Sequence, residues 1–344
     1  MSTPPRSRKT TMSDVAALAG VSRTLVSFVL SGKPGASDDT RDRVLAAARE
    51  LDYRPDNAAR LLARGRSRTL GVVIDVRQPF QADLVTHIYP VAESAGYEVL
   101  LSASAPGRDE TKAIEALLSH RCEGVILLGP SSSPEYVAHL EERAVVVMIG
   151  RALPATDFDI VRSADDHGVR QAVDHLVGLG HVDIHHVDGG TDSGATERRA
   201  AFRAAMDERG LPAVVWPGAH TEEAGSAAGT RMVAERRVPT AVMAGNDLCA
   251  VGLMDAFHRA GIAVPDDVSV VGYDDSELAH LSRIDLTTVR QDAEGLAATA
   301  VRFAIARLED ESLAPAELVV EPSLVVRGST GPVRTVARQT ARRT

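Results

Sequence analysis

Residues 69–289 alternate short apolar runs with longer stretches of helical pattern, and this alternation constrains the fold more than any other feature. A first series comprises TLGVVI (69–74), YEVLLS (97–102), GVILLG (124–129) and AVVVMIG (144–150), and a second comprises IHHVDGG, AVVW, AVMAGN and VSVVGYDD. Short apolar strands that alternate with helices are typical of parallel sheets covered on both faces. The sequence therefore predicts an α/β body built from two Rossmann-like subdomains.

Two later runs, LTTVRQ (286–291) and ELVVEPSLVVRG (317–328), are interpreted as crossovers and edge strands. Each subdomain then draws on two separate parts of the chain. We expect the first subdomain to comprise residues 69–160 plus 290–317. The second is expected to comprise residues 161–289 plus 318–330, with residues 331–344 as a disordered tail.

Residues 11–54 carry three short helical patterns, which predict an all-α helix-turn-helix unit behind a disordered basic arm, residues 1–10. Thr11 and Asp14 have the spacing of a capping box, and Gly20 ends the first pattern. Ser22 is the expected N-cap of a second helix, and Ser37 that of a third. The residues expected to face inward in the first and third helices are Val15, Leu18, Ala19, Val44, Leu45, Ala48 and Leu51.

The second helical pattern, residues 23–30, has one apolar face and one polar face. At 100° per residue, Leu25, Val26, Val29 and Leu30 share the apolar face, and Arg23, Thr24, Ser27 and Phe28 lie opposite. Arginine can bind guanine through two hydrogen bonds, and a thymine methyl suits Thr24 or Phe28. The pattern favours a recognition helix for the DNA major groove. The alternative is a three-helix domain with a solvated polar face.

Charge is distributed unevenly along the 344 residues, whose net charge is −9. Residues 1–68 contain 13 Lys and Arg against 7 Asp and Glu, whereas residues 69–330 contain 21 against 40. The last 14 residues add four arginines and no acid. A basic head on an acidic body concentrates attraction for phosphates at one end of the chain.

The run TMSDVAALAGVSRTLVSFVLSG closely resembles the headpiece of the lac repressor/galactose repressor family, and TRDRVLAAARELDYRPDNAARLLARGRSRTLGVV resembles that family's third helix, hinge and first body strand. The resemblance covers roughly residues 10–330. It implies a periplasmic-binding-protein-like bilobed body and a cytoplasmic repressor-type regulator, homodimeric on double-stranded operator DNA. The candidate DNA-binding residues of the headpiece are Ser22, Arg23, Thr24, Ser27 and Phe28. Many family members have arginine where Phe28 stands, which leaves the operator sequence open.

Residues 55–68 are predicted to form a hinge helix and linker. An isolated helix as short as Asp56–Arg64 is marginal in water, which would suit a segment that orders on DNA. By resemblance, Leu62 matches a leucine that enters a minor-groove step, and Arg60, with Arg64, Arg66 and Arg68, would neutralise phosphates. The alternative is an ordinary basic linker.

Polar residues after the predicted strands indicate a ligand site, because open parallel sheets bind ligands beyond the carboxyl ends of their strands. The candidates are Asp75, Phe80, Arg151, Arg198, Asn246 and Asp274. The elements ERRAAF, AGND and GYDD match family motifs, which selects Arg198 over Arg199 and supports Asn246 and Asp274. His220 is expected to be exposed. The resemblance implies effectors such as sugars, sugar phosphates, nucleosides or purines, and we favour a sugar or polyol.

The sequence gives little support for metal binding, a cofactor or catalysis. His181 and His185 have a spacing that on a helix could bind zinc, but their segment is interpreted as a loop entering a strand, so no metal site and no cofactor are predicted. No GxGxxG, Walker or GxSxG motif occurs, and no enzyme is expected. Cys122 and Cys249 are interpreted as buried thiols in a reducing compartment. The rival class is a periplasmic solute-binding protein, which would need an export signal and no basic headpiece.

Overall fold

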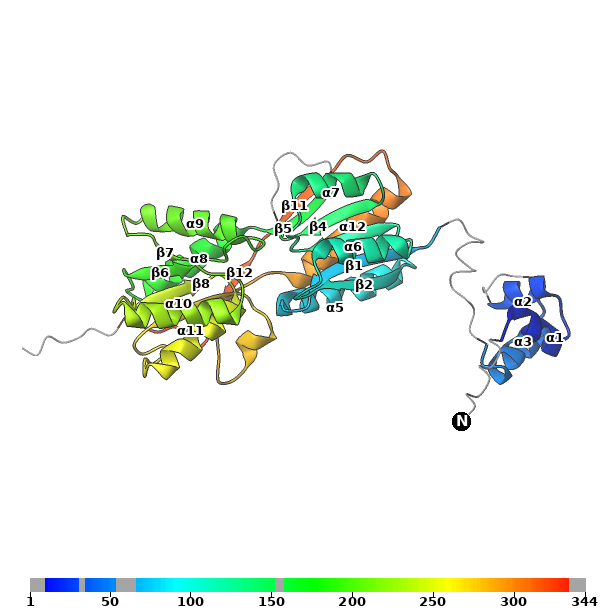
Figure 1. Ribbon diagram of the computed structural model, residues 1–344, viewed down its shortest axis with the longest axis horizontal. Helices are drawn as coiled ribbons and strands as arrows, with labels where there is room; N and C mark the ends of the chain where they lie inside the picture. Colours follow the sequence, from blue (N-terminus) through cyan, green and yellow to red (C-terminus); the bar gives the residue numbers. More distant parts are fainter. Residues whose placement is uncertain (1–9, 31–34, 54–65, 152–157, 334–344) are drawn as a thin grey trace, which may run out of the picture. The chain divides into compact units, whose positions relative to one another are not determined.

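The computed structural model describes residues 10–30, 35–53, 66–151 and 158–333. It divides the chain into two compact units, Met1–Ser67 and Arg68–Thr344 (Figure 1). The expected hinge helix, with Arg60 and Leu62, lies outside the described residues, as do residues 1–9 of the expected basic arm and residues 334–344 of the expected tail.

The first unit contains α1 (Met12–Ala19), α2 (Arg23–Leu30) and α3 (Asp38–Glu50). Helices α1 and α2 meet at 102°, within the range of a helix-turn-helix. The predicted caps are confirmed. The Asp14 carboxylate accepts hydrogen bonds from the Thr11 amide and hydroxyl, and Gly20 ends α1 with a φ of 65°. Ser22 Oγ accepts from the Leu25 amide at 3.2 Å, and Ser37 caps α3.

The core of this unit is made by small and branched side chains, namely Val15, Ala16, Ala19, Val26, Val29, Val44, Ala47 and Ala48. The inward placement predicted for Leu18 and Leu45 is wrong, because their exposed fractions are 47% and 39%. Each lies roughly 100° around its helix from the centre of the buried face. The helices pack together through alanine and valine side chains, and the longer Leu18 and Leu45 side chains lie outside this helix–helix contact.

The second unit, the body, consists of two lobes, as predicted. The sheet of the first lobe runs in the order β11-β5-β4-β3-β1-β2, and all its strand pairs are parallel. Its strands are β1 (Thr69–Asp75), β2 (Glu98–Ser104), β3 (Gly124–Leu128), β4 (Val145–Ile149), β5 (Asp159–Ser163) and β11 (Glu317–Val320).

Two helices cover each face of this sheet, which explains why its central strands, β3 and β4, are uninterrupted apolar runs. In β3, Ile126 and Leu128 pack toward α5 (Pro79–Ser94) and α12 (Ala293–Glu309). The intervening Val125 and Leu127 pack toward α6 (Glu110–Ser119) and α7 (Pro134–Glu141).

The sheet of the second lobe runs in the order β12-β10-β9-β8-β6-β7 and is parallel except for the pair of β12 with β10. Its strands are β6 (Ile184–Val187), β7 (Val214–Trp216), β8 (Ala241–Ala244), β9 (Ser269–Asp274), β10 (Thr287–Arg290) and β12 (Ser323–Val325). Helices α8 (Asp165–Gly178) and α9 (Ala195–Asp207) cover one face. Helices α10 (Glu222–Ala234) and α11 (Asp247–Arg259) cover the other, and the short 3-10 helix η1 (Glu277–His280) follows β9.

Three segments, the lobe connections, join the two lobes: β5 to α8, β10 to α12, and β11 to β12 (Figure 1). The predicted subdomain boundaries at 160/161 and 317/318 fall inside β5 and β11, which both belong entirely to the first lobe, so these boundaries move to after Ser163 and after Val320. The predicted boundary at 289/290 falls inside β10, which belongs to the second lobe, so it moves to after Arg290. The start of the expected tail also moves. The amide of Val333 donates to the Leu179 carbonyl, and that of Gly331 to Ser269 Oγ.

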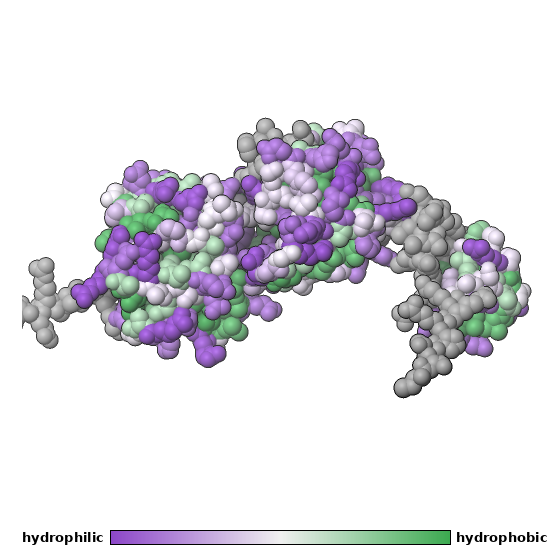
Figure 2. All heavy atoms as spheres, viewed as in Figure 1, coloured by the Kyte–Doolittle hydropathy of each residue, from purple (hydrophilic) through white to green (hydrophobic). Residues whose placement is uncertain are grey.

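On the face shown in Figure 2, hydrophilic side chains are spread over both lobes among smaller apolar areas. Within the described ranges, no single helix is long and apolar enough to cross a membrane. Helices α1 and α2 are long and apolar enough only when taken together, and the sharp bend between them is that of the helix-turn-helix.

Candidate functional site

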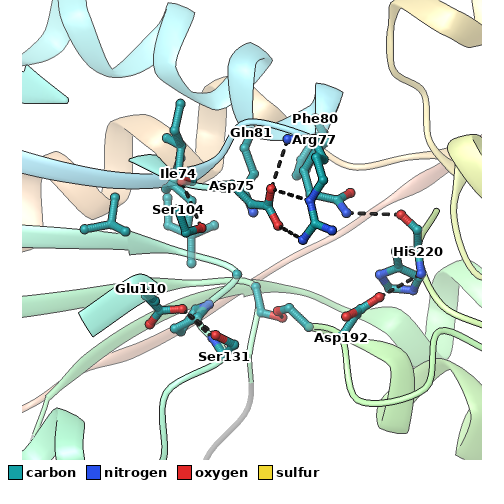
Figure 3. A pocket seen from close by; sticks show the side chains of 18 of the residues that line it. Ile74, Asp75, Arg77, Phe80, Gln81, Ser104, Glu110, Ser131, Asp192 and His220 are labelled. Atoms are coloured by element: carbon teal, nitrogen blue, oxygen red, sulfur yellow. Dashed lines mark hydrogen bonds and ion pairs between the residues drawn. The ribbon is translucent and has the colours of Figure 1, made fainter. Parts of the chain in front are cut away.

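A cleft with a cavity volume of about 320 Å³ lies where the carboxyl ends of strands from both lobes meet. This volume falls in the usual range for small-ligand pockets, roughly 300–1,000 Å³. Asp75 and Arg77 enter it from the first lobe, and Asp192 and His220 from the second (Figure 3). Of the six residues predicted to bind effector, five line the cleft: Asp75, Phe80, Arg198, Asn246 and Asp274.

Asp75 ends β1 and forms an ion pair with Arg77, whose Nη2 lies 2.7 Å from Asp75 Oδ2 (Figure 3). Burial alone would raise the pKa of Asp75, but the hydrogen bonds from Arg77 lower it below its usual value. The Asp75 amide donates to Gln81 Oε1 at 2.7 Å. Phe80, the second residue of α5, packs against the core of the first lobe and offers an apolar surface to the cleft.

Arg198 lies in the first turn of α9 and is buried among acidic partners. Its Nε donates to Asp165 Oδ1 at 2.9 Å, and its Nη1 to the Gly245 carbonyl at 2.8 Å. Its guanidinium carbon lies 3.6 Å from the centre of the Tyr273 ring, a cation–π contact. Neighbouring Arg199 pairs with Asp188 instead and is not among the lining residues.

Asp274 is the last residue of β9, with a φ of 116°. Gln291 Nε2 donates to its Oδ1 at 2.7 Å, and Arg198 Nη1 lies 3.9 Å away. Burial raises the pKa of Asp274 to about 6, although Arg198 and Gln291 favour the ionised form. The next residue, Asp275, faces elsewhere and pairs with Arg290 and Arg327, so the two adjacent carboxylates do not form a pair.

Asn246 caps α11, and its Oδ1 accepts a hydrogen bond from the Cys249 amide at 2.9 Å. Its Nδ2 reaches Gln78 Oε1 of the first lobe at 3.4 Å. Gln78 Nε2 in turn donates to the carbonyl of His220 at 3.1 Å (Figure 3). A third contact across the cleft joins Ser193 Oγ to the Gly150 carbonyl at 2.6 Å.

The expectation that His220 is exposed is wrong. Its side chain is buried in the wall of the cleft, and its amide donates to Asp192 Oδ2 at 2.7 Å (Figure 3). Burial and the nearby Arg198 lower the pKa of His220 well below its usual value. The ring is therefore neutral at physiological pH. The ring fits here because residue 189 is glycine: a Cβ at Gly189 would lie 2.1 Å from His220 Nε2.

Arg151 is the one predicted effector residue that is not among those lining the cleft. Its Nη1 donates to the carbonyls of Pro130 and Ser132, at 3.3 and 3.0 Å. It therefore ties the end of β4 to the loop after β3, while Gly150 beside it does line the cleft.

Several polar residues that line the cleft were not predicted from the sequence: Arg77, Gln78, Gln81, Ser104, Arg108, Asp109, Glu110, Ser131, Thr191, Asp192, Ser193 and Gln291. Many of them follow strand ends, as Ser131 follows β3 and Gln291 follows β10. The rule that selected Asp75 could therefore have found these. Gln81 and Glu110 lie in helices, and only the fold brings them to the cleft.

In the first unit, α2 presents the polar face that the helical wheel predicted. Arg23 and Thr24 are exposed in its first turn, and Ser22 caps it. Ser27 is half-buried, and Phe28 has an exposed fraction of 38%. Val26 and Val29 are buried beneath them.

Over the part of the chain that the structure describes, no three His, Cys, Asp or Glu side chains are grouped so as to hold a metal ion. His181 Nε2 faces the Gly331 carbonyl at 3.0 Å, and His185 Nδ1 accepts from Trp216 Nε1 at 3.0 Å. The two histidines thus have separate partners. Both cysteines are buried thiols, and burial raises the pKa of Cys122 to about 11 and that of Cys249 to about 12.

A helix-turn-helix unit followed by a two-lobed body with a polar cleft defines a class of ligand-responsive regulators, and comparison with known proteins agrees. Residues 11–56 match the model of bacterial regulatory proteins of the lacI family, and residues 173–330 match a periplasmic binding protein-like domain. The transcriptional regulator DegA of Bacillus subtilis is 34% identical over 95% of this chain and its own full length. GalR of Escherichia coli is 33% identical over 93% of this chain and 95% of GalR.

Solved structures give the same answer. The lac repressor dimer bound to operator and the anti-inducer ONPF is 29% identical, with a TM-score of 0.82, and the match covers 94% of this chain and all of that one. A LacI transcriptional regulator from a Rhodococcus species is 43% identical, with a TM-score of 0.74, over 77% of this chain and 99% of its own. The chain belongs to the lacI family of bacterial transcriptional regulators.

Proposed function

We propose that the chain is a repressor whose affinity for operator DNA is set by a small, neutral, polyhydroxylated effector, a sugar or polyol, bound in the cleft between the lobes. The observation that carries this proposal is the lining of the cleft, which comes from both lobes and sets charged, amide and hydroxyl side chains beside apolar ones such as Phe80. Carboxylates, amides and a buried guanidinium offer both donors and acceptors, the set that hydroxyl groups need.

The charges of the cleft favour a neutral ligand over a phosphorylated one. The lining contains the carboxylates Asp75, Asp109, Glu110, Asp192 and Asp274. Arg77 and Arg198 are paired with Asp75 and Asp165, and Arg108 donates to Ser102 Oγ and the Ala103 carbonyl. A phosphate would have to compete with these partners. The transcriptional regulator CelR, whose structure contains cellobiose, is 30% identical to this chain with a TM-score of 0.70, and this likeness supports a sugar.

On the DNA side, we propose that Ser22, Arg23, Thr24, Ser27 and Phe28 form the reading face, with Arg60 and Leu62 of the hinge. A homodimer is proposed because one small headpiece contacts few base pairs and two linked headpieces gain by effective concentration. The structure of the lac repressor dimer bound to operator supports this assembly. Since the target is chromosomal DNA, the proposed place of action is the cytoplasm.

A thermal-shift panel tests the effector proposal with D-galactose, cellobiose, sorbitol and adenosine as probes. A ligand that binds only the native state raises its melting temperature, and we expect a sugar or polyol to do so for the full chain. Asp274→Ala should lose that shift while leaving DNA affinity largely intact, because Asp274 lies in the cleft and not in the helix-turn-helix. Stabilisation by adenosine alone, or a shift that survives Asp274→Ala, contradicts the proposal.

A further inference from the structure

Gln291 occupies the point where the ligand cleft meets the lobe connections. It follows β10 on the connection to α12, and its side chain is buried and lines the cleft. Its Nε2 donates to Asp274 Oδ1, and its Oε1 accepts from Ser163 Oγ, both at 2.7 Å. One amide therefore joins a cleft carboxylate to a second connection, because Ser163 ends β5 directly before α8.

The chemistry of these two bonds fixes the orientation of the amide. An ionised carboxylate only accepts hydrogen bonds, so Asp274 selects the NH₂ side of Gln291. The carbonyl side is then turned toward the Ser163 hydroxyl, which can donate to it. A change in the charge or position of Asp274 must therefore alter the hydrogen bond between Gln291 and Ser163.

The third lobe connection is held by other groups that avoid the cleft. Gln171 on α8 donates from Nε2 to the Pro322 carbonyl at 3.1 Å, and its Oε1 accepts from the Leu324 amide at 2.8 Å. Gln171 is thus a glutamine that ties a connection without contacting Asp274, and it provides a matched control.

A second route from Asp274 to the first connection runs through Arg198, which pairs with Asp165 at the start of α8. Its Nη1 lies 3.9 Å from Asp274 Oδ1, beyond hydrogen-bonding distance. By contrast, both links of the route through Gln291 are short hydrogen bonds, so the Gln291 route is stiffer than the Arg198 route.

We propose that Gln291 is the positioning residue that transmits the state of Asp274 to the lobe connections, and thereby sets how far the lobes close. The inference rests on the proposed function only in identifying ligand binding as the event that alters Asp274. Its test needs neither effector nor operator, so its failure is distinguishable from failure of the proposed function.

The test measures lobe closure in the full chain by single-molecule energy transfer. Dyes are attached at Ala138→Cys on α7 and Ala204→Cys on α9, both exposed positions, while native Cys122 and Cys249 are buried. Excess unlabelled chain excludes transfer between subunits. The perturbation is Asp274→Asn, which removes the charge and keeps the volume.

We expect Asp274→Asn to change the ratio of open to closed molecules by about threefold or more, the size of coupling typical of residues in one hydrogen-bond network. The change should vanish in Gln291→Leu and Ser163→Ala backgrounds and persist in Gln171→Leu. If Gln291→Leu does not fold, the milder Ser163→Ala decides the matter. An unchanged ratio in the native background overturns the proposal, and so does a response that survives loss of the Gln291 link, which would assign the coupling to Arg198.

Discussion

Asp247 is buried beneath the cleft at the first position of α11, where hydrogen bonds surround it but no cation pairs with it among the described side chains. Its Oδ1 accepts from Thr288 Oγ1 at 2.6 Å, and its Oδ2 from the Ser276 amide and hydroxyl at 2.8 and 2.9 Å. Burial, together with nearby Asp274, raises the pKa of Asp247 to about 8. The folded protein thus holds a proton here that the unfolded chain, with an ordinary carboxyl pKa near 3.9, has released.

This shift makes stability depend on pH. Because Asp247 binds its proton more tightly in the folded state than in the unfolded state, this group makes stability fall as pH rises toward 8. Between pH 6.5 and 8 we expect the free energy of unfolding to decrease by about 1–2 kcal/mol from this group. Histidines whose pKa is lowered in the folded state, such as His186 at about 4, act in the opposite sense up to the ordinary histidine pKa near 6.5, so the window begins there, above the pKa of Asp274 at about 6.

Chemical denaturation of the body at several pH values between 6.5 and 8 measures the effect. Asp247→Asn should flatten the dependence, because the amide cannot release the proton. Asp255→Asn, on the exposed surface of the same helix, should leave it unchanged. A slope that Asp247→Asn does not alter would show that other groups cause it.

Single residues also show where sequence reasoning stops. Asp75, Asn246 and Asp274 could be predicted because each ends a strand or begins the following helix, and the ends of parallel strands share one edge. Arg151 fits the same rule, yet its long side chain turns to the carbonyls of Pro130 and Ser132. His220 looked like a surface histidine because its burial depends on Gly189 and Gly245, which are remote in the sequence.

At the scale of elements, the strands with uninterrupted apolar runs were all predicted, and β5 was not. Its sequence, DIVRS, begins and ends with polar residues that a pattern treats as boundaries. Asp159 is nevertheless buried, because its carboxylate accepts from Arg307 Nε at 2.9 Å and from the Ala316 amide at 2.8 Å. Only partners more than 140 residues away make an acid acceptable in that strand.

Glycines determine how closely α10 and α11 pack. A Cβ built at Gly225 would lie 2.0 Å from the Cys249 carbonyl oxygen, and one at Gly252 would lie 2.0 Å from that of Glu222. Both neighbours are backbone atoms, so they cannot move aside alone. Close packing against α10 therefore positions the start of α11, where Asn246 lines the cleft.

We expect Gly225→Ala to destabilise the body by about 3 kcal/mol, because overpacking must separate the two helices. Gly178→Ala is the matched control, since a Cβ there meets nothing within 4 Å. That change lies in the last turn of α8 and should stabilise by about 0.5–1 kcal/mol through lower backbone entropy of the unfolded chain. Equal effects of the two substitutions in thermal unfolding would contradict the packing argument.

At the scale of the whole molecule, charge separates the two activities along the chain. Residues 1–68 are basic and carry the helix-turn-helix, whereas residues 69–330 are acidic and carry the cleft. Phosphate contacts release counterions, so affinity for DNA must fall steeply with salt. An acidic body adds nothing to that attraction.

Binding to DNA selected from a random-sequence pool, measured by fluorescence anisotropy at 50 and 200 mM salt, tests the central claim most directly. The full chain should bind one sequence preferentially and lose about a hundredfold in affinity across that range, as expected for about four phosphate contacts. Arg23→Ala should relax preference at one base pair of each half-site. The fragment 69–344 should not bind. If that fragment binds the selected DNA as tightly as the full chain, the assignment of DNA recognition to the helix-turn-helix is wrong.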